Sequence, residues 1–336
     1  MSTLSHVRVA MIGAGSMANN VHYPSLASFD DVEIAAICDF DAQRLNATAD
    51  RYGVERRYSD YRQMIEQVAP DAVYAIGPPH TFYDIWVWCL TQGLNLCIEK
   101  PMGLTLHHAQ MLAYLAQTHG CITQVSLQRR ASPLAVLLRN KCLERGPITH
   151  AVCRFYKCEP WAFTAAYGHM MGDGVHAIDT LRWMCGGEVV DVQSVVRCVG
   201  TPDTNLYHAL LTFDNGATGV LLTSWSSGRR IFAVEMHAPQ ICAEAELETT
   251  GTLYADGDTV GETFHARAIA GGDELYIYGG FQAKNRQFID AVKSGTQANG
   301  CFADALKTME VAETILAQHR LATLEGGTRP IGYPQR

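Results

Sequence analysis

The stretch from Val7 to Ala18, V-R-V-A-M-I-G-A-G-S-M-A, decides the fold of the first part of this chain. Its first six residues form an apolar, β-branched run that predicts a short buried strand, and a helical pattern follows the glycines. In the spacing G-x-G-x-x-A, Gly13 allows a tight turn and Gly15 lets a phosphate group come close to the backbone. The first turn of the helix offers N–H groups to an anion. We therefore expect the pyrophosphate of a dinucleotide at this loop, held by Gly13, Gly15, Ser16 and Met17.

The next predicted strand, Val32 to Cys38, ends at Asp39. About 20 residues after a glycine motif, a carboxylate at a strand end binds the ribose hydroxyls of the adenosine. Phe40 and Asp41 offer no cation to a 2′-phosphate, and Arg44 is the one nearby residue that would favour it. We therefore expect Asp39 to select NAD over NADP. The alternative for Asp39 is a cap for the helix that follows.

Strands and helices keep alternating up to about residue 125, which predicts a doubly wound parallel sheet. Two more strand ends carry polar side chains: Gly77-Pro78-Pro79-His80 follows the run 71–76, and Glu99-Lys100-Pro101 follows the run 94–98. Open α/β sheets bind ligands at the carboxyl ends of their strands. A lysine placed there before a proline suits chemistry better than packing. His80 has two interpretations, a residue of the binding site or only a residue of the first turn of the following helix. The candidate cofactor-binding residues at these strand ends are Gly77, Pro78, His80, Glu99 and Lys100.

The pattern changes after residue 127, where strand-like runs follow one another without helices between them. Such runs predict an antiparallel sheet, and Asp214-Asn215-Gly216 is a hairpin turn signal between two of them. We expect residues 1–126 to form a dinucleotide-binding Rossmann domain, and residues 127–336 to form an α+β domain with an open, mostly antiparallel sheet. The five runs are 149–157, 189–199, 206–213, 218–226 and 231–237, and two helices, 281–293 and 302–319, complete the second domain.

An open sheet leaves one face without a helical layer, and apolar faces of this kind usually find a partner. The runs between Val189 and His237 alternate apolar and polar residues only loosely, which suits burial on both faces. We therefore expect a homodimer or homotetramer that forms through this sheet.

A glycine-rich loop at 168–174 runs into a helix that carries His176 and Asp179 at i and i+3. Imidazole titrates near neutral pH, so a histidine one turn from a carboxylate suits proton transfer. The alternative for His176 is a buried histidine that only packs in the core. Asp173 has two interpretations as well, a catalytic carboxylate or the N-cap of the helix.

The composition excludes several classes of function. Lys and Arg number 26 against 34 Asp and Glu, for a net charge of -8, so a nucleic-acid partner is not expected. Eleven cysteines without a C-x-x-C pair predict neither a disulfide framework nor a metal site, and indicate a reducing, cytoplasmic environment. The N-terminus lacks the charged start of a signal peptide. Apolar runs stay well below the ~18 residues that a membrane span requires.

Taken together, Gly13-x-Gly15, Asp39, Glu99-Lys100-Pro101 and Gly174-x-His176-x-x-Asp179 resemble the Gfo/Idh/MocA oxidoreductases over nearly the whole chain. The resemblance implies NAD(P)-dependent hydride transfer, commonly at a secondary alcohol of a sugar, inositol or related cyclic polyol. It implies that Lys100 holds the reacting hydroxyl, that His176 takes its proton, and that Asp179 fixes the histidine tautomer. The lysine and the histidine could exchange these roles.

The chain departs from the family pattern at three positions. Gly77 stands where threonine is usual, Ala131 replaces the aromatic of an R-R-F-x-P hinge, and Gly172 stands where the family often has a catalytic aspartate. The family also includes enzymes with NAD-assisted elimination or glycoside cleavage, and non-catalytic sensors that keep the dinucleotide fold. Reduction of NAD across a panel of sugars and polyols would separate these possibilities.

Overall fold

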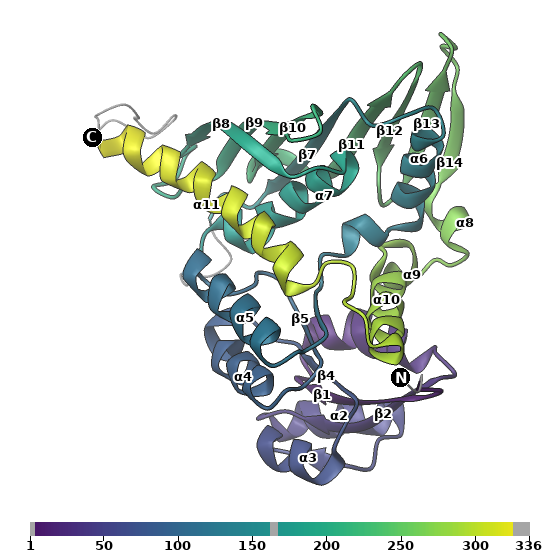
Figure 1. The fold of residues 1–336 in the computed structure, drawn as a ribbon, viewed down its shortest axis with the longest axis vertical. Coiled ribbons are helices and arrows are strands. Elements are labelled where there is room, and N and C mark those ends of the chain that lie inside the picture. The colour runs from purple at the N-terminus through teal and green to yellow at the C-terminus, as the bar shows by residue number, and fades with distance from the viewer. Residues whose placement is uncertain (1–3, 162–166, 325–336) are drawn as a thin grey trace. The chain divides into compact units, whose positions relative to one another are not determined.

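A computed structural model describes residues 4–161 and 167–324, which fall into two compact units (Figure 1). The first unit contains the chain up to Gln128 together with Glu274–Leu306, and the second contains Arg129–Asp273 and the residues from Lys307 onward. The expected change of architecture near residue 127 is therefore present. The second unit is interrupted, however, because residues 274–306 belong to the first.

The first unit is built on a six-stranded parallel sheet in the order β3-β2-β1-β4-β5-β6. This order confirms the predicted doubly wound sheet. It reverses between β1 and β4, and the crevice at such a switch point is where these sheets bind ligands. The strands are β1 Val7–Ile12, β2 Val32–Cys38, β3 Arg57–Tyr58, β4 Ala72–Ala75, β5 Leu96–Ile98 and β6 Thr123–Val125.

Helices cover both faces of this sheet. Apolar side chains of β1 and β2 form one core with residues of α1, α2 and α10, and right-handed crossovers place α3, α4 and α5 on the opposite face. On that opposite face, the indole N–H of Trp86 donates to the carbonyl of Ala75 at 3.0 Å. The helices are α1 Tyr23–Ala27, α2 Ala42–Tyr52, α3 Tyr61–Val68, α4 Pro79–Thr91, α5 Leu106–Thr118 and α10 Phe281–Ser294.

Helix α10 corrects the predicted domain assignment, which placed it with the antiparallel sheet. Phe288 and Ile289 are fully buried in the core of the first unit. At the surface, Asp31 accepts hydrogen bonds from Arg286 at 2.7 Å and from Lys293 at 2.6 Å. Apolar burial and two ion pairs therefore hold this late segment on the parallel sheet.

The second unit is built on an eight-stranded sheet in the order β14-β13-β12-β11-β7-β10-β9-β8. Only β7 and β10 run parallel, so the sheet is mostly antiparallel as expected, and the predicted Asp214-Asn215-Gly216 turn joins β9 to β10. Strands β12 to β14 were not predicted: β12 is rich in alanine and glutamate, which have low strand propensity, and β14 is only four residues long. The strands are β7 His150–Cys158, β8 Val189–Arg197, β9 Leu206–Phe213, β10 Thr218–Ser224, β11 Ser226–Ala238, β12 Ile241–Glu246, β13 Thr250–Ala255 and β14 Glu262–His265.

Side chains along β7, β9 and β10 alternate in burial within the single chain, and burial of their second face through assembly stays a prediction. In β9, Tyr207 and Leu211 are buried, whereas His208 and Leu210 on the other face are not. Helices pack on the buried face, among them α7 Val175–Cys185 against β7 and β10, and α6 Pro133–Leu143 contacts β11 to β13. The remaining elements are α8 Ala266–Ala270, α9 Leu275–Tyr278 and α11 Phe302–Leu324, whose residues from Lys307 onward join the second unit.

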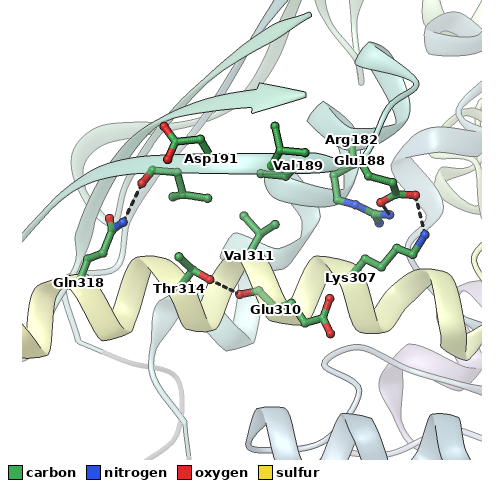
Figure 2. A pocket seen from close by; sticks show the side chains of 11 residues that line it. Arg182, Glu188, Val189, Asp191, Lys307, Glu310, Val311, Thr314 and Gln318 are labelled. Carbon is green, nitrogen blue, oxygen red and sulfur yellow. Dashed lines mark hydrogen bonds and ion pairs between the residues drawn. The ribbon is translucent and has the colours of Figure 1, made fainter. Parts of the chain in front are cut away.

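A groove of about 430 Å³ lies between β8 and α11 in the second unit (Figure 2). Three of its charged side chains form ion pairs with one another: Glu188 accepts hydrogen bonds from Lys307 at 2.6 Å and from Arg182 at 3.1 Å. Burial opposes the charge of Glu188, yet these two cations outweigh it and lower the pKa of the carboxyl. None of the candidate site residues lines this groove, so we interpret its charges as structural.

The described residues include no helix that is long and apolar enough to cross a membrane. Over the same residues, no group of three or more His, Cys, Asp or Glu side chains is arranged to hold a metal ion. All eleven cysteines are free thiols, and burial raises the pKa of Cys153 to about 12. A buried thiol of this kind packs as a small apolar group.

Candidate active site

The glycine loop of the first unit has the two properties that a dinucleotide requires. Gly13 adopts a φ of +106°, and a Cβ there would overlap the carbonyl oxygen of Ile76, so this position admits only glycine. A Cβ on Gly15 would meet nothing within 4 Å, so the backbone is open to a ligand at that point. The chain becomes helical from Ser16, where first-turn N–H groups can bind phosphate oxygens. The residues present therefore fit a pyrophosphate.

Asp39 is tied to this loop by a direct contact. One carboxylate oxygen accepts the N–H of Ala14 at 2.7 Å, and the other accepts the N–H of Asp41 at 2.8 Å. Asp41, and not Asp39, caps α2, because its side chain accepts the N–H groups of Gln43 and Arg44. The alternative in which Asp39 is the helix cap is therefore wrong.

Arg44 is the cation that could have favoured a 2′-phosphate. Its Nε lies 3.1 Å from an oxygen of Asp41, so the guanidinium has a carboxylate partner of its own. Hydrogen bonds from the Arg44 and Gln43 backbone help to lower the pKa of Asp41 and keep that carboxylate charged. Two carboxylates therefore stand at the end of β2, which disfavours a second phosphate on the ribose.

Sequence reasoning missed Asn19, which braces the glycine loop from the following helix. Its amide nitrogen donates to the carbonyl of Ala14 at 2.8 Å and contacts the hydroxyl of Thr48 at 3.0 Å. A polar residue one turn after a glycine motif is the available signal for such a brace.

The loop after β4 explains why glycine replaces threonine at position 77. A Cβ on Gly77 would overlap the ring of Phe82, which also lies 3.4 Å from a Cβ placed on Gly13. The aromatic ring thus occupies the space that a threonine side chain would need. Pro78 is the N-cap of α4 and His80 lies exposed in its first turn, as the simpler interpretation of His80 expects.

Glu99 and Lys100 follow β5 directly, and the Lys100–Pro101 peptide bond is cis. Glu99 is buried and contacts His22, whose Nε2 lies 3.0 Å from a carboxylate oxygen. The other ring nitrogen, Nδ1, lies 3.1 Å from the amide oxygen of Asn285. Sequence reasoning missed both residues: His22 lies one turn after Ala18 in the π-helical turn Ala18–His22 before α1, whereas nothing local marks Asn285.

In the second unit, His176 is the second residue of α7 and is 8% exposed. A π-helical turn, Met170–Gly174, leads into the helix, and a Cβ on Gly174 would contact Met170 and Trp225. The backbone carbonyl of His176 accepts the hydroxyl of Thr180 at 2.7 Å, which fixes the start of the helix. Glycine at position 174 is therefore required for the close packing against Met170 where α7 begins.

Asp179 is deeply buried, and Arg130 engages both of its oxygens. The Nε of Arg130 donates at 2.8 Å, and the hydroxyl of Thr308 contacts the carboxylate at 3.3 Å. Arg130 belongs to the R-R-A-S-P segment, so this segment is anchored on the histidine helix. These contacts favour a structural role for Asp179.

Asp173 is not an N-cap, which corrects that interpretation. The N-cap positions of the two helical segments are His169 and Gly174, and Asp173 lies inside the turn between them. Its carboxylate accepts a hydrogen bond from Lys157, at the end of β7, at 2.6 Å. A Cβ on Gly172 would lie 3.0 Å from the ring of Tyr167, so a side chain at the position of the usual family aspartate would crowd that ring.

Comparisons with known proteins match both parts of the chain. A model of an oxidoreductase family with an NAD-binding Rossmann fold matches residues 7–127, and a model of the Gfo/Idh/MocA C-terminal domain matches residues 144–253. The rhizopine catabolism protein MocA of Rhizobium meliloti is 25% identical over 340 residues, which cover 96% of this chain and 99% of that protein. The scyllo-inositol 2-dehydrogenase (NAD(+)) of Bacillus subtilis is 24% identical over 235 residues, 66% of this chain and 68% of its own. The crystal structure of a dehydrogenase from Chromobacterium violaceum has the same fold, with a TM-score of 0.87 at 22% identity over 96% of this chain and 98% of that one.

Proposed function

Because this chain belongs to the Gfo/Idh/MocA family of NAD-binding oxidoreductases, we propose that it oxidises a secondary alcohol of a sugar, an inositol or a related cyclic polyol. One observation carries the proposal: the first unit has both a complete dinucleotide loop after β1 and a lysine, Lys100, after β5. In the sheet, only β4 lies between these two strands. The name of one relative, scyllo-inositol 2-dehydrogenase (NAD(+)), supports a cyclic polyol.

The first unit serves the cofactor in this proposal. Gly13 and Gly15 admit the pyrophosphate, and Asp39 is held in place by Ala14 for the ribose hydroxyls. When bound, NAD supplies the hydride acceptor, and the protein supplies orientation and charge. Titration of NAD and NADP by intrinsic fluorescence tests the assignment, and tighter binding of NADP would contradict it.

Lys100 and His176 act on the substrate in this proposal. A lysine ammonium can hold the reacting hydroxyl and stabilise the alkoxide that develops as hydride leaves. A histidine can accept the hydroxyl proton, and the two residues can exchange these roles. We assign Asp179 to holding α7 in place, because Arg130 engages both of its oxygens. The second unit then contributes the histidine helix and the surface for assembly.

The direct test follows NADH formation by its absorbance while the protein is offered NAD with sugars, inositols and their methyl ethers. We expect sustained reduction of NAD with a cyclic polyol. Tight NAD binding without turnover on any compound would favour a sensor. Loss of a substituent without net NADH formation would favour the NAD-assisted elimination that some relatives of the family carry out.

A further inference from the structure

A buried polar cluster in the first unit joins three segments that are far apart in the sequence. His22 is 1% exposed, Asn285 is 1% exposed and Glu99 is 6% exposed. His22 ends the π-helical turn Ala18–His22 that precedes α1, Asn285 lies on α10, and Glu99 follows β5. Two aromatic rings pack against the imidazole in T-shaped arrangements, Tyr74 at a centroid distance of 5.8 Å and Phe281 at 6.3 Å.

The hydrogen bonds of this cluster have a direction. If Asn285 accepts through its amide oxygen, His22 Nδ1 must donate to it. On the other side of the ring, one proton must lie between Nε2 and the Glu99 oxygen 3.0 Å away, since two lone pairs would repel. The second oxygen of Glu99 faces the backbone N–H of Lys100 at 3.3 Å. The contacts therefore run in a chain from Asn285 through His22 and Glu99 to the backbone of Lys100.

Stability alone does not account for such a cluster. Burying charged and polar groups costs free energy, and apolar side chains of similar volume often stabilise a protein as well or better. A fully hydrogen-bonded network does, however, fix one geometry. Here the fixed group is the carboxylate next to Lys100, and Asn285 ties it to α10, the helix that returns from late in the sequence.

We propose that His22 and Asn285 are positioning residues that hold the Glu99 carboxylate, and through it the backbone that carries the Lys100 amine. This inference rests on the proposed role of Lys100 at the substrate. In this proposal, α10 does more than cover the parallel sheet, because its Asn285 helps to place the backbone of Lys100. An error of about 1 Å in such a group can cost about 10²-fold in rate.

The test compares four variants of the full-length protein. Asn285→Leu removes the acceptor at similar volume and leaves the contact between His22 and Glu99 intact. His22→Leu removes that contact, and His22→Gln restores one amide donor toward Glu99. Tyr74→Phe is the matched control, because the Tyr74 hydroxyl is buried beside His22 and has no hydrogen-bond partner among the described residues.

Two readouts are measured. The first is hydrogen exchange at the Lys100 amide without substrate, which we expect Asn285→Leu and His22→Leu to speed by ~10-fold, about the worth of one hydrogen bond. The second is turnover at saturating NAD, which we expect to fall by ~10–10²-fold while the NAD dissociation constant changes by less than ~3-fold. His22→Gln should recover most of both, and Tyr74→Phe should change neither.

Unchanged exchange at Lys100 in Asn285→Leu would overturn the inference, and this holds even if His22→Leu does not fold. A fall in turnover equal to that of Tyr74→Phe would also overturn it. The exchange readout needs no substrate, so it decides the inference separately from the proposed function. If Lys100→Met keeps full turnover while exchange responds as expected, the proposed role of Lys100 fails and the positioning of its backbone stands.

Discussion

Asp31→Asn should weaken the attachment of α10 to the parallel sheet at neutral pH. Hydrogen bonds from Arg286 and Lys293 lower the pKa of Asp31 from 3.8 to about 2. At ~1.4 kcal/mol per pKa unit, this lowering corresponds to roughly 2 kcal/mol. The side chain is 29% exposed, so solvent screening reduces the expected loss to roughly 1–1.5 kcal/mol.

The sign of the pH dependence follows from the lowered pKa. The contribution of Asp31 is complete above its unfolded pKa and disappears as the pH falls through about 2. Urea unfolding of the wild type and Asp31→Asn should therefore differ by roughly 1–1.5 kcal/mol near pH 7, and by less at about pH 3. Asp30→Asn is the control, because Asp30 is exposed next to Asp31. Equal losses in the two variants, or a gap that widens in acid, would refute the reasoning.

Three further predictions concern the site and the open sheet. Gly77→Thr should lower the free energy of unfolding by ~1–3 kcal/mol, measured by thermal unfolding, because the new side chain overlaps Phe82. Adding Phe82→Ala should relieve part of that loss. If the double variant loses the sum of the two single losses, the contact is contradicted. Asp173→Asn should keep most of the turnover, since an amide can still accept the hydrogen bond of Lys157, whereas a ~10²-fold loss would mark a catalytic carboxylate. Leu210→Glu on the exposed face of β9 should shift a homodimer or homotetramer to monomer in light scattering, and a wild type that is already monomeric at micromolar concentration would refute assembly through this sheet.

The parallel sheet and the glycine loop were predictable because their signals are local. The predicted strand runs at β1, β2, β4 and β5 are short and apolar and are followed directly by glycine or a charged residue, and helices separate them. The link between Asp39 and the loop follows from the topology, since β1 and β2 are neighbours. The helical nature of residues 281–293 was equally local.

The parts that failed depend on contacts between distant segments. An apolar stripe with Phe288 shows that α10 is amphipathic, yet the same stripe would fit either sheet. Asp39 was a reasonable candidate for the N-cap of α2 from the sequence, but the N-cap is Asp41. His22 lies 77 residues from Glu99, and Lys157 lies 16 residues from Asp173 on a different element, so no spacing in the sequence reveals these partners.

The most direct test of the central claim measures NADH formation by Lys100→Met, His176→Ala and the double variant on a substrate that the wild type oxidises. Each single change should lower turnover by ~10²–10⁴-fold, with NAD affinity and melting temperature nearly unchanged. The double variant should be far less impaired than the product of the two losses, because residues that act as one unit are not additive. Full activity in His176→Ala, or a loss in Lys100→Met that is explained by lower stability, would contradict the account.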